Sequence, residues 1–336
     1  MALVAIGGAL ALVAIVALAR GGGGGGGTHA ASRPISITRG EPARKEIARP
    51  VRPPHVAVVQ TGTLPAPVQD AAAAVVAPGS FLLMGGIDAG ESSVADILRA
   101  SPSGAVRIGS LPSALHDATA SALGGYAYLF GGGVVESFSA ITRVSPGGST
   151  APAGQLPTRA SDVAGATIGD TIYVVGGYTG QTPLSTILAW RPGEAARVVA
   201  TLPKPLRYAA VAALNGALYI AGGTSGEAAS SDVYSFRPGH DLTRIGRLPA
   251  PLTHAAAAAV GDSVYVFGGR SAAADGQTPQ VLEIWPDGVV HKVGLLPRAL
   301  SDMAAVALGG KVVLAGGRDS AGGVQDAILT AVVGGK

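Results

Sequence analysis

The sequence has no cysteine among its 336 residues. This excludes disulfides, thiolate metal sites and a cysteine nucleophile, and it leaves the cellular compartment open. Aromatic residues make up only 4% and charged residues 13%, whereas hydrophobic residues make up 48%. Much of the hydrophobic content is alanine, so we expect a core in which backbones approach each other closely.

Positive charge is also scarce over most of the chain, although the net charge is +3. Residues 20–52 hold seven Lys or Arg and two Glu, whereas the rest of the chain holds 17 basic and 19 acidic residues. The larger part therefore has no basic stripe of the kind that binds nucleic acid. We do not expect a nucleic acid partner.

Two short motifs recur along the chain in phase with each other. Pairs of glycines begin at Gly85, Gly131, Gly176, Gly222, Gly268 and Gly316, and Leu-Pro pairs begin at Leu64, Leu111, Leu156, Leu202, Leu248 and Leu296. A period near 46 residues is typical of propeller blades rather than helical solenoids. Six in-phase copies predict a single domain of six tandem units.

The fifth unit shows the expected strands of one blade. After Leu248-Pro249, an alanine-rich stretch and the segment 264–267 flank a Gly-Asp turn, and segments 281–285 and 289–293 flank a Pro-Asp-Gly turn. Such a pattern predicts a four-stranded antiparallel meander. The fold class is therefore an all-β, six-bladed propeller with four-stranded antiparallel blades.

The two ends of the repeat region complement each other. The last unit ends with residues 328–333, which supply a third strand and no fourth, whereas residues 55–60 precede the first Leu-Pro without a blade of their own. We expect the N-terminal strand to complete the last blade, because this closure removes exposed sheet edges.

The turns predict which face of the domain binds other molecules. Tight turns join the first to the second strand and the third to the fourth strand of each unit, and in a meander these turns fall on one face. The opposite face carries the Leu-Pro segments and the longer loops that follow each glycine pair. Long loops on a rigid scaffold are the usual place for binding, so we expect this loop face to be the functional one.

These features resemble the kelch repeat family of β-propellers. The resemblance rests on the segments Ile172-Tyr173-Val174-Val175-Gly176-Gly177, Leu218-Tyr219-Ile220-Ala221-Gly222-Gly223 and Val264-Tyr265-Val266-Phe267-Gly268-Gly269. It covers residues 55–335 and implies a divergent member of a bacterial, membrane-tethered type. The tryptophan typical of the kelch fourth strand is missing.

One residue of each unit occupies an equivalent place between Leu-Pro and the first strand. These residues are Asp70, Asp117, Asp162, Tyr208, His254 and Asp302. The resemblance implies that they face the mouth of the central channel. Four carboxyls, a phenol and an imidazole are suited to a cation, a basic peptide or sugar hydroxyls, and the competing interpretation is that each caps local backbone N–H groups.

The residue that follows each glycine pair supplies further candidates. Arg270 and Arg318 fall in adjacent units near His254 and Asp302, and together they could hold a carboxylate or phosphate. Tyr178 could offer an aromatic platform on the same face. The pattern predicts no catalytic residue, metal site or cofactor, since the remaining histidines lack ligand spacing.

The N-terminal part predicts a membrane attachment. Residues 1–20 include 18 consecutive apolar or glycine residues, which as a helix would span roughly 27 Å, enough for the hydrocarbon layer. We expect a transmembrane anchor, with a cleaved signal peptide ending near Ala17-Leu18-Ala19 as the alternative. Residues 21–54 are expected to form a disordered tether, and residues 55–336 the propeller.

The main functional hypothesis is a non-enzymatic, membrane-tethered kelch propeller. It would be a monomer that binds a peptide, protein or glycan through the loop face outside the cytoplasm. The alternative is a carbohydrate-active enzyme of sugar epimerase or mutarotase type, with Asp302 and His254 as the acid–base pair. A third possibility, a cytosolic scaffold, follows if the basic residues after the apolar run hold the domain inside the cell.

Overall fold

The computed structural model describes residues 55–272 and 276–334. The apolar run, the glycine-rich segment and the basic segment all lie outside these residues. Within the described residues, every regular element long enough to be named is a β-strand. No helix in the described part has the length and apolar character needed to cross a membrane.

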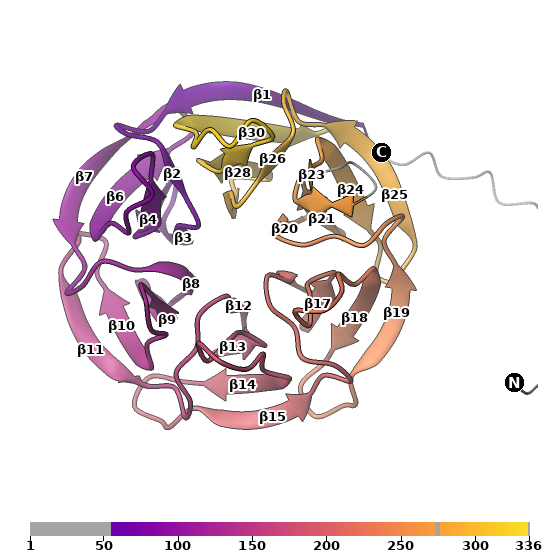
Figure 1. The fold of residues 1–336 in the computed structure, drawn as a ribbon, viewed down its shortest axis with the longest axis horizontal. Coiled ribbons are helices and arrows are strands. Elements are labelled where there is room, and N and C mark those ends of the chain that lie inside the picture. Colours follow the sequence, from indigo (N-terminus) through magenta and orange to yellow (C-terminus); the bar gives the residue numbers. More distant parts are fainter. Residues whose placement is uncertain (1–54, 273–275, 335–336) are drawn as a thin grey trace, which may run out of the picture. The chain divides into compact units, whose positions relative to one another are not determined.

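The first strands of the repeat units form an inner ring. They are β3 (Ala72–Ala77), β8 (His116–Leu123), β12 (Ala164–Ile168), β16 (Ala210–Leu214), β20 (Ala256–Val260) and β27 (Ala304–Leu308). Each contacts the next, and β27 contacts β3, so the ring is closed (Figure 1). Their alanines allow six strands to approach one axis, as the sequence predicts.

The second strands are buried between neighbouring sheets. They are β4 (Ser80–Met84), β9 (Tyr126–Gly133), β13 (Thr171–Val175), β17 (Ala217–Ala221), β21 (Ser263–Phe267) and β28 (Lys311–Ala315). In β13, β17 and β21 all five residues are buried. Burial on both faces explains why these strands are continuously apolar rather than alternating.

The third and fourth strands complete each meander. The third strands are β6 (Asp96–Ser101), β10 (Ala140–Val144), β14 (Thr186–Trp190), β18 (Asp232–Phe236), β24 (Gln280–Ile284) and β30 (Ala327–Val333). The fourth strands are β7 (Gly104–Ser110), β11 (Thr150–Gln155), β15 (Arg197–Thr201), β19 (Thr243–Arg247) and β25 (Val290–Leu295), together with β1 (Val56–Thr63). The fourth strands lie at the periphery of the ring (Figure 1).

The strands form four separate four-stranded sheets and one eight-stranded sheet. The larger sheet has the order β20-β21-β24-β25-β1-β30-β28-β27, and a single parallel pair, Val56 with Gly294, joins its two antiparallel halves. All-antiparallel four-stranded sheets around an axis are the arrangement of a β-propeller.

The N-terminal strand joins the two ends of the repeat region. β1 pairs antiparallel with β30, from Val56 opposite Val333 to Thr63 opposite Ala327. This confirms the predicted pairing of residues 56–60 beside residues 328–332. Core packing also crosses the junction, since Phe81 and Leu83 share a cluster with Val313 and Ile328.

The two sequence markers meet at each junction between units. The second glycine of each pair donates its N–H to a carbonyl four residues after the leucine of the next Leu-Pro, for example Gly132 to Ala160 at 2.9 Å. The last such bond runs from Gly317 to Val68 of the first unit at 2.8 Å. A Cβ on the preceding residue, Gly316, would lie 2.1 Å from the same carbonyl oxygen. This close backbone approach is the reason that the markers recur in phase.

Two-residue antiparallel ladders connect segments of the loop face. Leu-Pro segments pair with the loops after the glycine pairs through β2 (Val68–Gln69) with β5 (Ile87–Asp88) and β26 (Leu300–Ser301) with β29 (Arg318–Asp319). A third ladder, β22 (Arg270–Ser271) with β23 (Gly276–Gln277), lies within one loop. The predicted partition of the loops onto one face is therefore observed.

Candidate functional site

The six equivalent residues predicted to face the channel mouth line a single cavity. Asp70, Asp117, Asp162, Tyr208, His254 and Asp302 enclose about 120 Å³, and the first residue after each of them lines it too. The sequence pattern therefore located the members of this set, which we call the central ring.

All six residues of the central ring have a left-handed backbone. Their φ angles lie between 53° for Tyr208 and 61° for Asp302. Among the described residues only two other non-glycine positions, Glu91 and Asn215, have positive φ. The left-handed region is uncommon for non-glycine residues and is a strained conformation for a bulky side chain such as Tyr208.

The backbone also links the central ring from unit to unit. Five of the six N–H groups donate to the carbonyl of the ring residue in the preceding unit: Asp70 to Asp302 (2.9 Å), Asp117 to Asp70 (3.2 Å), Tyr208 to Asp162 (3.3 Å), His254 to Tyr208 (3.2 Å) and Asp302 to His254 (3.0 Å). These bonds and the φ angles together fix the six side chains around one cavity.

Glycine would adopt these angles with less strain, and the chain uses glycine at 30 other described positions with positive φ. A left-handed non-glycine residue costs about 1–2 kcal/mol. Strain of this kind clusters at functional sites, where the side chain is needed. The role of the central ring stays a prediction, because aspartate and histidine also adopt the left-handed region more readily than most residue types.

The carboxyls of Asp302 and Asp162 are each paired with an arginine. Asp302 Oδ2 accepts hydrogen bonds from Arg270 Nη2 and Ser301 Oγ, both at 2.5 Å. Asp162 accepts from Arg207 Nε, and this pair is nearly enclosed since the Asp162 side chain is 3% exposed. Two of the four ring carboxyls therefore have a fixed cationic partner.

The other two carboxyls lie against acidic neighbours. Burial raises the pKa of Asp70 well above its usual value, and the negative charges of Asp302 and Asp117 raise it further. Burial likewise raises the pKa of Asp117, with Asp162 and Asp302 adding to the effect. Two neighbouring carboxyls that cannot both ionise share a proton, as in carboxyl dyads.

The two remaining residues of the central ring, Tyr208 and His254, form an aromatic pair. The rings of Tyr208 and His254 stack with centroids 3.8 Å apart and an interplanar angle of 23°. His254 Nδ1 lies 2.8 Å from Thr253 Oγ1. Burial lowers the pKa of His254 to about 4 and raises the pKa of the Tyr208 phenol, so both side chains are neutral at pH 7.

The three candidates outside the central ring have different interaction partners. Arg270 binds Asp302, whereas Arg318 binds Glu91 at 2.8 Å. The structure therefore gives the two arginines separate carboxylate partners instead of a shared open site. Tyr178 is covered by the guanidinium of Arg207, whose Cζ lies 3.9 Å from the ring centroid.

Sequence reasoning missed Arg207. This residue binds Asp162, lies over Tyr178 and donates from Nη2 to the Tyr208 hydroxyl at 3.3 Å. The available signal was its position immediately before Tyr208. Only the three-dimensional neighbourhood shows that it neutralises a carboxyl 45 residues away.

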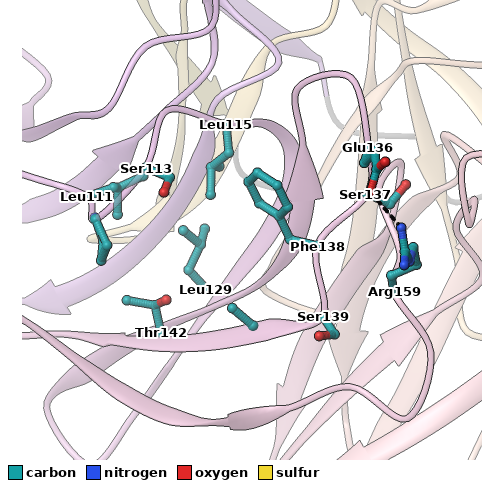
Figure 2. Close-up of a pocket in the computed structure, with 12 residues that line it drawn as sticks. Leu111, Ser113, Leu115, Leu129, Glu136, Ser137, Phe138, Ser139, Thr142 and Arg159 are labelled. Carbon is teal, nitrogen blue, oxygen red and sulfur yellow. Dashed lines mark hydrogen bonds and ion pairs between the residues drawn. The ribbon is translucent and has the colours of Figure 1, made fainter.

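A larger cavity of about 430 Å³ lies elsewhere on the loop face. Figure 2 shows Leu115, Leu129 and Phe138 gathered on one side and the ion pair between Glu136 and Arg159, 2.8 Å long, on the other. The cavity is built from a Leu-Pro segment and the loop after a glycine pair.

Among the described residues, no group of three or more His, Asp or Glu side chains is arranged to hold a metal ion. The prediction of no metal site therefore stays a prediction for the chain as a whole.

Comparisons with known proteins agree with this architecture. Residues 159–194 and 205–241 each match the Kelch motif. The structure is similar to a solved one titled "Structure of YjhT", with a TM-score of 0.69 and 14% sequence identity over 80% of this chain and 95% of that chain. A search of curated proteins finds no match. The chain therefore carries Kelch motifs within a ring of four-stranded sheets that has the β-propeller fold.

Proposed function

We propose that the protein is a six-bladed kelch propeller that binds a peptide, protein or glycan at the loop face, with the central ring as its recognition centre. One observation carries this proposal: six non-glycine residues hold left-handed backbone angles around one cavity. Side chains retained at strained positions are best explained by what they contact.

The electrostatics of the central ring favour binding over proton-transfer catalysis. A general base works best with a pKa near the operating pH. His254, with a pKa of about 4, is far from that range. Its Nδ1 is bonded to Thr253, while Asp302 is bonded to Arg270 and Ser301, so the acid–base pair that an enzyme would need has other partners.

A second candidate, a sugar epimerase or mutarotase, is supported by one feature of the same cavity. Asp70 and Asp117 have raised pKa values, and perturbed carboxyls that stay protonated can act as general acids. NMR measurement of anomeric exchange in free sugars would detect this activity. Acceleration that is lost in Asp302→Asn would favour the enzyme.

The membrane tether and the location belong to the proposal as well. Residues 1–20 would anchor the chain, residues 21–54 would act as the tether, and residues 55–336 would form a monomeric propeller outside the cytoplasm. Protease treatment of intact cells tests this: shedding of the folded domain supports it, and protection of the domain contradicts it.

Binding of the full-length chain in detergent to peptide and glycan arrays tests the proposed function. The wild type is compared with Asp302→Asn on the loop face and with Glu194→Gln on the opposite face, which removes the same charge. We expect binding that is lost in Asp302→Asn and kept in Glu194→Gln. Equal loss in both variants, or binding unaffected by either, would contradict a loop-face site.

A further inference from the structure

We propose that the central ring binds a single alkylammonium group, from a lysine side chain or a chain amino terminus, in exchange for a proton held among its carboxyls. This inference rests on the proposed function and names the chemistry that the loop-face site recognises.

The charge of the cavity suits a cation. Four carboxyls line it, and only Asp302 and Asp162 have an arginine partner. Asp70 and Asp117 are left without a countercharge, and burial together with the neighbouring carboxyls raises their pKa values, which favours the protonated forms. An entering cation can replace such a proton and leave the charge of the cavity unchanged.

The cavity also holds a buried carboxylate oxygen without a permanent donor. The Asp302 side chain is 1% exposed and lines the cavity. Its Oδ2 is bonded to Arg270 and Ser301, whereas its Oδ1 has no such fixed partner, and the neighbouring Asp70 carboxyl shares a hydrogen bond with the Asp302 side chain. Asp70 can donate only while it is protonated, so an ammonium group that displaces this proton would take its place as the donor.

The cavity is also small, with a volume of about 120 Å³. Sites for whole small molecules usually enclose roughly 300–1,000 Å³. The cavity therefore fits the tip of a side chain or a chain terminus, while the rest of the partner would lie across the loop face.

The charged groups that surround Asp70 and Asp117 single out these two carboxyls as the ones that exchange a proton. Asp70 faces Asp302, Asp117 and Arg270. Asp117 faces Asp162, Asp302 and Arg207, with His116 Nε2 3.7 Å from its Oδ2. Burial lowers the pKa of His116, which disfavours its cationic form beside Asp117.

The exchange step is balanced. The ammonium group enters with its three N–H donors and full positive charge, and the O–H bond of the protonated Asp70 or Asp117 breaks. The proton leaves to solvent or buffer, and the resulting carboxylate accepts a hydrogen bond from the ammonium. Binding should therefore weaken as the pH falls, because a higher proton concentration opposes a binding step that releases a proton.

Isothermal titration calorimetry of the full-length chain in detergent at pH 6 tests the proposal. The probes are N-acetyl-lysine methylamide, with a side-chain ammonium, and glycine methylamide, with an amino-terminal one. The control is the lysine compound acetylated on its side chain, which has the same stem and no charge. Two buffers of different ionisation enthalpy give the number of protons released.

We expect the lysine compound to bind with release of about one proton per ligand. We expect the acetylated control to bind at least tenfold more weakly. The lysine compound should bind more tightly than glycine methylamide, because a long unbranched stem reaches into a small cavity. The reverse order of affinities would assign the site to chain amino termini instead. Binding of the acetylated control with equal affinity, or binding without proton release, would overturn the proposal.

Two variants distinguish binding in the cavity from a general effect of negative charge on the loop face. The double variant Asp70→Asn/Asp117→Asn imitates both protonated carboxyls, so it should fold with at least the wild-type melting temperature yet bind at least tenfold more weakly and release no proton. Glu136→Gln removes a negative charge elsewhere on the loop face and should bind within twofold of wild type. Equal weakening in both variants would contradict a specific site.

The outcome also distinguishes this inference from the proposed function. If neither amine binds while array ligands still bind and depend on Asp302, the ammonium site is wrong and the loop-face function stands. If no array ligand depends on Asp302, both are wrong.

Discussion

Replacing Gly316 with alanine tests the junction that closes the ring. Gly316 has a φ of +67°, and a Cβ there would lie 2.1 Å from the carbonyl oxygen of Val68. The same oxygen accepts the N–H of Gly317 at 2.8 Å. The substitution must therefore move backbone of the last unit away from the first.

The matched control is Gly309→Ala. Gly309 has a φ of +59°, and a Cβ there would meet nothing within 4 Å, so the control carries the strain of the left-handed angle alone. That strain costs about 1–2 kcal/mol. Gly316→Ala adds the displacement of the junction and a weakened hydrogen bond, and the bond alone contributes about 1 kcal/mol.

Differential scanning calorimetry gives the comparison. We expect Gly316→Ala to lower the free energy of unfolding by at least about 2 kcal/mol more than the control does. At roughly 2–4 °C per kcal/mol, its melting temperature should be lower than that of the control by a further 4–8 °C. Equal melting temperatures for the two variants would refute the account of the glycine pairs as close backbone contacts between units.

Further predictions concern the central ring. Asp70 and Asp117 have raised pKa values in the fold, so they contribute stability that is fully present below the unfolded pKa and is lost as the pH rises through the folded one. Denaturant titrations from pH 4 to pH 8 should show a smaller fall in the free energy of unfolding for Asp70→Asn/Asp117→Asn than for wild type, and parallel curves would count against the shared protons. His254 has the opposite sign: its pKa of about 4 gives stability that is present above pH 6.5 and is lost as the pH falls towards 4. A His254→Gln variant should lose less stability over that window, and an unchanged acid limb would argue against a buried neutral imidazole. Asp302→Ala should lower the free energy of unfolding by about 1–3 kcal/mol, because it leaves the Arg270 guanidinium without its carboxylate, and the loss should shrink in the Arg270→Gln/Asp302→Ala pair. Tyr208→Gly should relieve the left-handed strain while removing the stacked pair, and a binding loss with little change in melting temperature would mark Tyr208 as a contact residue.

Much of the architecture follows from local pattern. Alanine-rich first strands, continuously apolar second strands and the phase of two markers predicted the sheets, the pairing of Leu-Pro segments with the long loops, and the pairing of β1 with β30. The central ring was also predictable, because one position per unit carries a chemically distinctive residue at a fixed distance after Leu-Pro.

The internal pairing of the ring was not predictable. Whether Asp162 binds Arg207, or Arg318 binds Glu91, depends on distances between residues 45 and 227 positions apart. The left-handed backbone of the ring was hidden as well, since aspartate at a turn looks the same in the sequence whether it caps a loop or lines a cavity. Arg207 had no motif of its own, and only the fold places it over Tyr178.

The central claim is that carboxyls of the central ring are protonated and give up a proton when a cation binds. Infrared difference spectroscopy of the full-length chain at neutral pH measures this through the C=O stretch of protonated carboxyls. The account predicts a carboxylic acid band that diminishes in Asp70→Asn, diminishes in Asp117→Asn and is unchanged in Glu136→Gln. A spectrum without that band, or a band that both ring variants leave intact, would contradict it.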